Sequence, residues 1–104
     1  MSKVYLKPGV SISGVLPETV LGIVLASTFF NDLNQKFTLT SVCDGVHKTN
    51  SLHYFGAAFD IRIREFRGII AAEAAERLQE FLGNDFRVIC EVDHIHVQLN
   101  VHVS

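Results

Sequence analysis

The stretch "HIHVQLNVH", residues 94–102, decides the fold, because hydrophobic and polar side chains alternate along it without interruption. Successive side chains of a strand point to opposite faces, so this alternation predicts a strand over 95–103. The apolar face would carry Ile95, Val97, Leu99, Val101 and Val103, and the polar face His94, His96, Gln98, Asn100 and His102. One face is therefore expected to be buried and the other to stay open.

Three further segments have the composition of strands. Residues 36–42, 57–63 and 86–92 are rich in β-branched or aromatic residues. In the second of them, Asp60 and Arg62 alternate with apolar neighbours. Each strand thus combines an apolar face with a mostly polar one, which is typical of an antiparallel sheet covered on one side.

Two helices are expected to supply that cover. The first would begin at Pro17 and end near Leu33, with Val20, Val24 and Leu25 toward the core. The second would span about 68–82, with a stripe of Ile70, Ala74, Leu78 and Phe81. The pattern predicts an α+β fold. A single small domain over 1–104 would have an antiparallel sheet of about four strands, two helices on one face and a groove on the other.

The connection between the last two strands determines what lies beside His96. A two-residue loop of Asp93 and His94 would set Glu91 directly opposite His96. A carboxylate would then lie next to a histidine on the face that also carries Asp60.

Composition restricts the class of function. The chain has 104 residues, 48% of them hydrophobic, and a net charge of -2, so it offers no basic field for nucleic acid. It contains no apolar run of 18 residues, and its start, "MSKVYLKPG", lacks the apolar region of a secretory signal. No membrane partner is therefore expected. Cys43 and Cys90 have no metal-ligand spacing and are expected to be reduced.

Three side chains form a candidate metal site. His53 and Asp60 lie seven residues apart around Gly56, which would let the chain fold back, and His96 would come from a neighbouring strand. Imidazole and carboxylate are good zinc ligands, and a catalytic site uses three protein ligands plus water. This spacing is not specific. A loop histidine, a solvated aspartate and a surface pair of His94 and His96 would produce the same pattern.

Two motifs carry a more specific resemblance. "SLHYFGAAFD", residues 51–60, is similar to the S-x-H-x-x-G-x-A-x-D signature of the M15 family of zinc D-Ala-D-Ala carboxypeptidases. "EVDHIHV", residues 91–97, resembles that family's acid-and-histidine block, and the run from Ser51 is also similar to the hedgehog signalling domain. The likeness covers about 38–99. It implies a hedgehog/DD-peptidase type of fold and one zinc ion held by His53, Asp60 and His96.

The resemblance also implies catalytic residues. Asp93 has the acid-x-x-His spacing of many M15 enzymes and is the first candidate for the general base that activates a zinc-bound water. Glu91 is the second candidate, because hedgehog has its acid further upstream. His47 would bind the developing oxyanion or would be a solvated loop histidine.

Substrate binding is where the chain departs from the family pattern. Many members have an arginine after the strand that corresponds to Thr40-Ser41, and Val42-Cys43-Asp44 stands here instead. Lys48, Arg62 or Arg87 would have to replace it. Ser51 and His94 are expected at the rim of the substrate groove.

The function implied is zinc-dependent hydrolysis of stem peptides in bacterial peptidoglycan, as a carboxypeptidase or an endopeptidase. The size resembles that of minimal endolysin-like peptidases of phages, and a monomer is expected. Without a signal, the chain would be made in the cytoplasm and would reach the cell wall by export, by lysis or in a virion. The alternative is a zinc-stabilised protein-interaction module, or a virion structural module, without catalytic activity.

Overall fold

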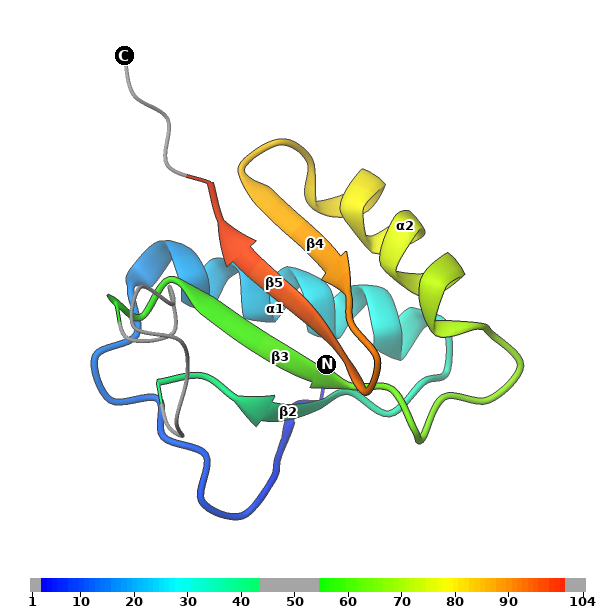
Figure 1. Ribbon diagram of the computed structural model, residues 1–104, viewed down its shortest axis with the longest axis horizontal. Helices are drawn as coiled ribbons and strands as arrows, with labels where there is room; N and C mark the ends of the chain where they lie inside the picture. Colours follow the sequence, from blue (N-terminus) through cyan, green and yellow to red (C-terminus); the bar gives the residue numbers. More distant parts are fainter. Residues whose placement is uncertain (1–2, 44–54, 101–104) are drawn as a thin grey trace.

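A computed structural model describes residues 3–43 and 55–100 of the chain. A sheet of five strands lies in front of two helices in the view of Figure 1. The strands are β1 (Tyr5–Leu6), β2 (Thr38–Ser41), β3 (Ala58–Arg62), β4 (Phe86–Cys90) and β5 (His94–Leu99), and the helices are α1 (Pro17–Asp32) and α2 (Ala71–Leu82). The α+β class expected from the alternating strands is confirmed.

The sheet is mixed and has the strand order β1-β2-β3-β5-β4. The pairs β2–β3, β3–β5 and β4–β5 are antiparallel, as expected, but β1 adds a fifth strand parallel to β2. The N–H groups of Tyr5 and Lys7 donate to the carbonyl oxygens of Phe37 and Leu39, both at 2.9 Å. These bonds cover the outer edge of β2, and they hold Lys7 at the rim of the open face.

Helix α1 buries a different side from the one expected. Val20 and Val24 were predicted to face the core, but they are 42% and 52% exposed, while Gly22 and Ala26 face inward. The prediction was wrong because α1 is apolar on nearly all sides, so no single stripe stands out. Small residues face the sheet and let the helix approach closely, and the Phe86 ring lies against Gly22. Leu25, also predicted to face inward, packs partly buried against the core.

Helix α2 begins at Ala71, later than the expected Gly68. Gly68 has a φ of 73°, and Ile70 is extended at the N-cap position, so neither continues a helix. Ile70 was expected in the core but is 72% exposed, and Phe81 is 49% exposed. Two other members of the predicted stripe, Ala74 and Leu78, are buried as expected.

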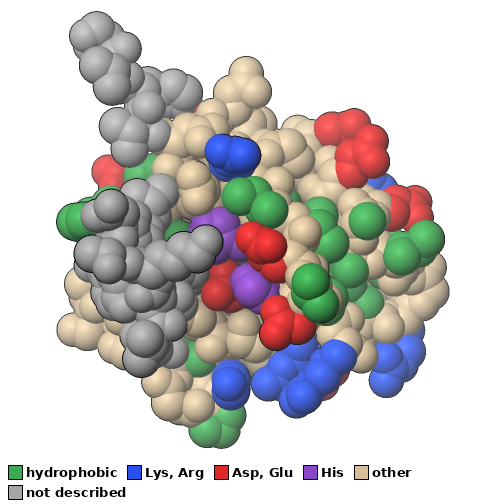
Figure 2. All heavy atoms as spheres, in the orientation of Figure 1, with side chains coloured by type: hydrophobic (Ala, Val, Ile, Leu, Met, Phe, Trp, Pro, Cys, Tyr) green, Lys and Arg blue, Asp and Glu red, His purple; other side chains and the backbone are tan. Residues whose placement is uncertain are grey.

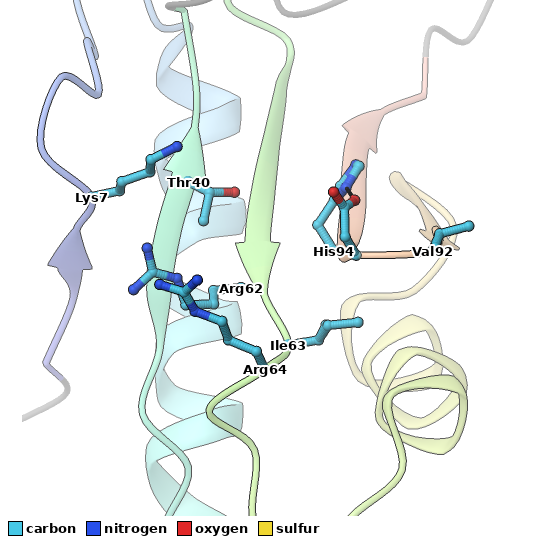
Figure 3. A pocket seen from close by; sticks show the side chains of 8 residues that line it. Lys7, Thr40, Arg62, Ile63, Arg64, Val92 and His94 are labelled. Atoms are coloured by element: carbon cyan, nitrogen blue, oxygen red, sulfur yellow. Dashed lines mark hydrogen bonds and ion pairs between the residues drawn. The ribbon is translucent and has the colours of Figure 1, made fainter.

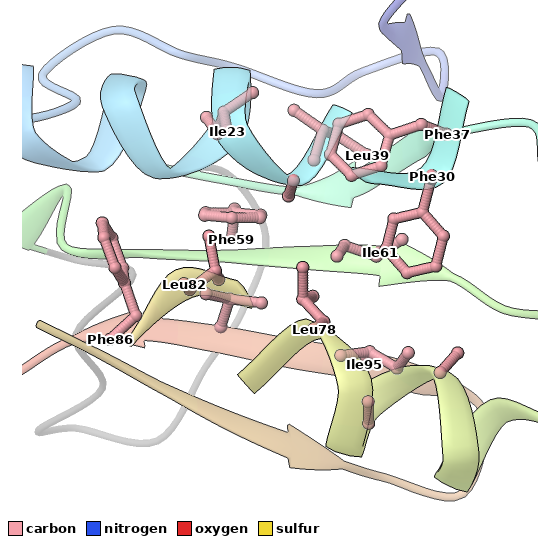
Figure 4. Packing of buried hydrophobic residues seen from close by; sticks show 14 of the residues in the cluster. Ile23, Phe30, Phe37, Leu39, Phe59, Ile61, Leu78, Leu82, Phe86 and Ile95 are labelled. Atoms are coloured by element: carbon pink, nitrogen blue, oxygen red, sulfur yellow. The ribbon is translucent and has the colours of Figure 1, made fainter. Parts of the chain in front are cut away.

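The core lies between the sheet and the two helices, as Figure 4 shows. Its side chains from β3 and β5 are the apolar members of the predicted alternation, among them Phe59, Ile61, Ile95 and Val97. The Phe30 ring of α1 stacks on the Phe37 and Phe66 rings at centroid distances of 5.9 and 5.0 Å. The opposite face of the sheet is left for polar side chains. In the described part of the chain, no helix has the length and apolarity needed to cross a membrane.

The β4–β5 hairpin has a register two residues away from the expected one. Ile89 lies opposite His96, and the Glu91 N–H donates to the His94 carbonyl at 2.8 Å. Val92 and Asp93 therefore form the turn, and the predicted pairing of Glu91 with His96 is wrong. A shift of two residues keeps every side chain on its face, so alternation alone could not distinguish the two registers.

Candidate metal centre

Asp60 of β3 and His96 of β5 are directly paired across the open face of the sheet. The Nδ1 atom of His96 lies 3.0 Å from Oδ1 of Asp60. The Asp60 residue is 7% exposed although it lies on the face of the sheet opposite the two described helices. Figure 2 shows histidine side chains among acidic ones near the middle of this face. Alternation predicted that these two residues share a face, and the structure brings them into contact.

Gln98 holds the other side of the His96 ring. Its Oε1 atom lies 2.9 Å from His96 Nε2, so the ring is fixed between an amide and a carboxylate. Burial disfavours the charged imidazole, but the hydrogen bonds with Asp60 and Gln98 and the negative charges of Asp60 and Glu91 outweigh it and raise the pKa of His96. The charged form of the His96 imidazole is therefore more favoured beside Asp60 than it would be in water.

His94 connects the turn to this pair. Its Nε2 atom lies 3.6 Å from Asp60 Oδ1, and its Nδ1 atom lies 2.6 Å from Oδ1 of Asp93. The hydrogen bond with His94 lowers the pKa of the Asp93 carboxyl. Asp93 thus contacts the neighbouring imidazole, and its carboxylate remains largely exposed. Glu91, also exposed, lies opposite His94 at the end of the hairpin.

A close backbone contact fixes the entry to β3. Gly56 has a φ of 69°, and a Cβ atom at this position would clash with the carbonyl oxygen of Gly14. The Leu16 N–H donates to the Gly56 carbonyl at 3.0 Å, which joins the segment before α1 to the start of β3. The glycine between the two halves of the motif therefore has a steric role. It sets where β3 begins, and so where Asp60 lies.

The donor set fits part of a zinc site. Two ligands at ~2.0–2.1 Å from a tetrahedral zinc ion are about 3.3 Å apart, close to the 3.0 Å between His96 Nδ1 and Asp60 Oδ1. The amide of Gln98 would orient the ring as partners of metal-bound histidines do. Within 3–43 and 55–100, no three His, Cys, Asp or Glu side chains form a group that could hold a metal ion. The third predicted ligand, His53, lies outside the described residues, as do His47, Lys48 and Ser51.

A pocket of about 590 Å³ adjoins His94, and its lining includes Lys7, Thr40, Arg62 and Arg64. Arg62, a predicted substrate residue, lies opposite His94 in the β3–β5 pair. Arg87 was also predicted as a possible replacement for the missing arginine. It lies opposite Gln98 and lines a second pocket beside α2.

Sequence reasoning missed Lys7, Arg64 and Gln98. The strand alternation put Gln98 on the polar face of β5 and could have suggested a contact with His96. No local pattern indicates that Lys7 lies near a residue of β3, because that contact depends on the parallel pairing of β1 with β2.

Comparison with protein-family models, with curated proteins and with solved structures found no match to this chain.

Proposed function

We propose that this chain is a zinc-dependent peptidase that hydrolyses bonds in the stem peptides of bacterial peptidoglycan. The observation that carries the proposal is the Asp60–His96 pair, a carboxylate and an imidazole 3.0 Å apart on the open face of the sheet. The motif likeness to M15 enzymes supports it, because Asp60 and His96 are the two described residues at that family's ligand positions. His53 is proposed as the third ligand.

The protein's own groups would prepare the site for substrate. Asp60 and His96 would hold the zinc ion, and Gln98 would keep the His96 ring in orientation. When bound, zinc would polarise the scissile carbonyl and make water a stronger nucleophile at neutral pH. The apolar core behind β3 and β5 keeps these strands rigid, so the ligands would keep their positions during the reaction.

Asp93 is the proposed general base, and Glu91 is the alternative. Asp93 is proposed for its acid-x-x-His spacing from His96, and its carboxylate would accept a proton from water and pass it to the leaving amine. The hydrogen bond with His94 lowers the pKa of Asp93, which makes it a weaker base than an unperturbed aspartate. Its bond with His94, which lies beside Asp60, ties its carboxylate to the rim of the site. Glu91 is supported by its position opposite His94 and by the effect of its charge on His96.

Steady-state kinetics on purified stem peptides test the proposal. Asp93→Asn and Glu91→Gln each remove a proton acceptor with little change in shape. General-base catalysis contributes about 10²–10⁴-fold, so Asp93→Asn should lower kcat by that amount while zinc content is unchanged. Glu91→Gln should have a modest effect. A severe loss in Glu91→Gln alone would assign the base to Glu91. Zinc-loaded wild type that cleaves neither D-Ala-terminated nor L-Ala-D-Glu bonds from pH 5 to 9 would refute the peptidase.

A zinc-stabilised interaction module is the second candidate, and the outer side of α1 favours it. Val20, Leu21 and Val24 are 42%, 56% and 52% exposed, and α1 carries no charged side chain between Glu18 and Asp32. Apolar surface of this kind is common where proteins bind one another. The same peptide assay separates the two candidates, because a binding module would hold zinc and cleave nothing.

A further inference from the structure

We propose that the pocket beside His94 is a carboxylate-binding subsite, in which Lys7 and Arg64 recognise a carboxylate of a peptide bound along the open face. The identity of the ligand as a peptide rests on the proposed function. The preference for an anion rests on the pocket itself. No motif indicated Lys7 or Arg64, and both residues line the pocket.

The charge of the pocket is the first argument. Lys7, Arg62 and Arg64 all line it, in a chain whose net charge is -2. Figure 3 shows these three side chains lying together, across the pocket from His94. Three cations that share one pocket repel one another unless anions are near, so the arrangement favours a bound anion.

The described acidic side chains near the pocket do not neutralise its positive charge. Arg62 bonds to Glu65 at 3.2 Å, and Asp93, the one acidic residue among the described residues of the lining, bonds to His94. Among the residues that the structure describes, the side chains of Lys7 and Arg64 form no ion pair. Two positive groups are therefore available to a ligand, together with the neighbouring Thr40 hydroxyl.

The position of the pocket fits a peptide that reaches the metal centre. Arg62 follows Asp60 by two residues on the same face of β3, a separation of about 7 Å along the strand. An extended peptide covers this length in about two residues. His94, which also lines the pocket, lies 3.6 Å from Asp60, so the pocket wall begins beside the candidate metal centre. The carboxylate should therefore belong to a residue near the scissile bond, either as the C-terminal group or as an acidic side chain.

A binding experiment tests the anion preference without cleavage. The probes are N-acetyl-D-alanine and its amide, titrated into ¹⁵N-labelled, chelator-treated chain and followed through the backbone amides of residues 7, 62 and 64. We expect the acid to bind about five- to tenfold more tightly than the amide, the size expected for one charge-assisted contact. Equal binding of acid and amide, or shifts that avoid all three amides, would overturn the subsite.

Matched variants assign the effect to the two side chains. Lys7→Met with Arg64→Gln should abolish the preference for the acid. Lys3→Met with Arg77→Gln removes the same charge from exposed positions that do not line the pocket, and it should leave the preference intact. An equal loss in both double variants would show a general charge effect and would contradict the proposal.

Kinetics then separate the subsite from the peptidase. With a cleaved stem peptide, the pocket double variant should raise KM about five- to tenfold, matching the binding loss, with little change in kcat. Peptides with the acid only at the C-terminus or only on a side chain show which carboxylate is bound. If no peptide is cleaved, the peptidase fails while the binding result still decides the subsite. If peptides are cleaved but Lys7→Met with Arg64→Gln has the same KM as Lys3→Met with Arg77→Gln, the carboxylate subsite is refuted while the peptidase stands.

Discussion

Asp60, His96 and Gln98 form a short chain of contacts across β3 and β5. The carboxylate and the amide lie 3.0 and 2.9 Å from the two nitrogens of one imidazole. A ring held on both sides loses little freedom when it binds a metal ion. We therefore propose Gln98 as the residue that would hold the His96 ring in position for a metal ion.

Replacing Gln98 should weaken zinc binding without unfolding the protein. Loss of an orienting partner usually costs about 10–100-fold in metal affinity, so Gln98→Ala should raise the zinc Kd by that factor in a competition titration. Asn100→Ala is the control, because Asn100 donates to the Asn84 carbonyl and has no bond with His96. Equal zinc affinity in Gln98→Ala and wild type would remove this role from Gln98.

Glu65 should make a stability contribution that depends on pH. Its hydrogen bond from Arg62, together with Lys36 at 3.4 Å, lowers the pKa of its carboxyl in the folded chain. The unfolded chain thus binds a proton more readily, so this stability is present above the usual glutamate pKa of ~4.3 and is lost as the pH falls through the lowered value. Urea unfolding should show Glu65→Gln less stable than wild type at pH 7 and equal to it at acid pH. If the difference in unfolding free energy between Glu65→Gln and wild type grew as the pH fell, the lowered pKa of Glu65 would be contradicted.

The elements show which parts of the fold local sequence can predict. Alternation over 57–63 and 95–103 predicted that Asp60 and His96 share the open face, but the direct pairing of the two residues is known only from the structure. The side of α1 that faces the core was mispredicted, because a helix apolar all round has no stripe to read. The hairpin register was also mispredicted, since a shift of two residues leaves both faces unchanged. The parallel strand β1 has only two residues, and its partner lies more than thirty residues away.

Gly56 and Gly68 form a matched pair for testing the entry to β3. Both have a positive φ, but a Cβ atom at Gly68 would have no neighbour within 4 Å, whereas one at Gly56 would meet the Gly14 backbone. Gly68→Ala should cost about 1–2 kcal/mol of unfolding free energy from its backbone conformation alone. Gly56→Ala should cost about 1–3 kcal/mol more, because overpacking adds to that strain. Equal losses in urea unfolding would show that the Gly14 contact is unimportant.

At the scale of the whole molecule, a metal ion between β3 and β5 would couple segments that are distant in sequence. Zinc bound only to the folded chain stabilises it by mass action, by about 2.7 kcal/mol at a free concentration of one hundred times Kd. For a domain of this size, removal of zinc should lower Tm by on the order of 10 °C, and added zinc should restore it. Calorimetry with and without chelator measures the change. The Asp60→Asn variant should show a much smaller response.

Anomalous diffraction at the zinc edge, from crystals grown with zinc and without chelator, would locate the metal itself. We predict one peak on the open face of the sheet, about 2.0–2.2 Å from a carboxylate oxygen of Asp60, from His96 Nδ1 and from a ring nitrogen of His53. Zinc-containing crystals with no peak beside Asp60 and His96, or with the His53 ring directed away from it, would contradict the proposed metal centre.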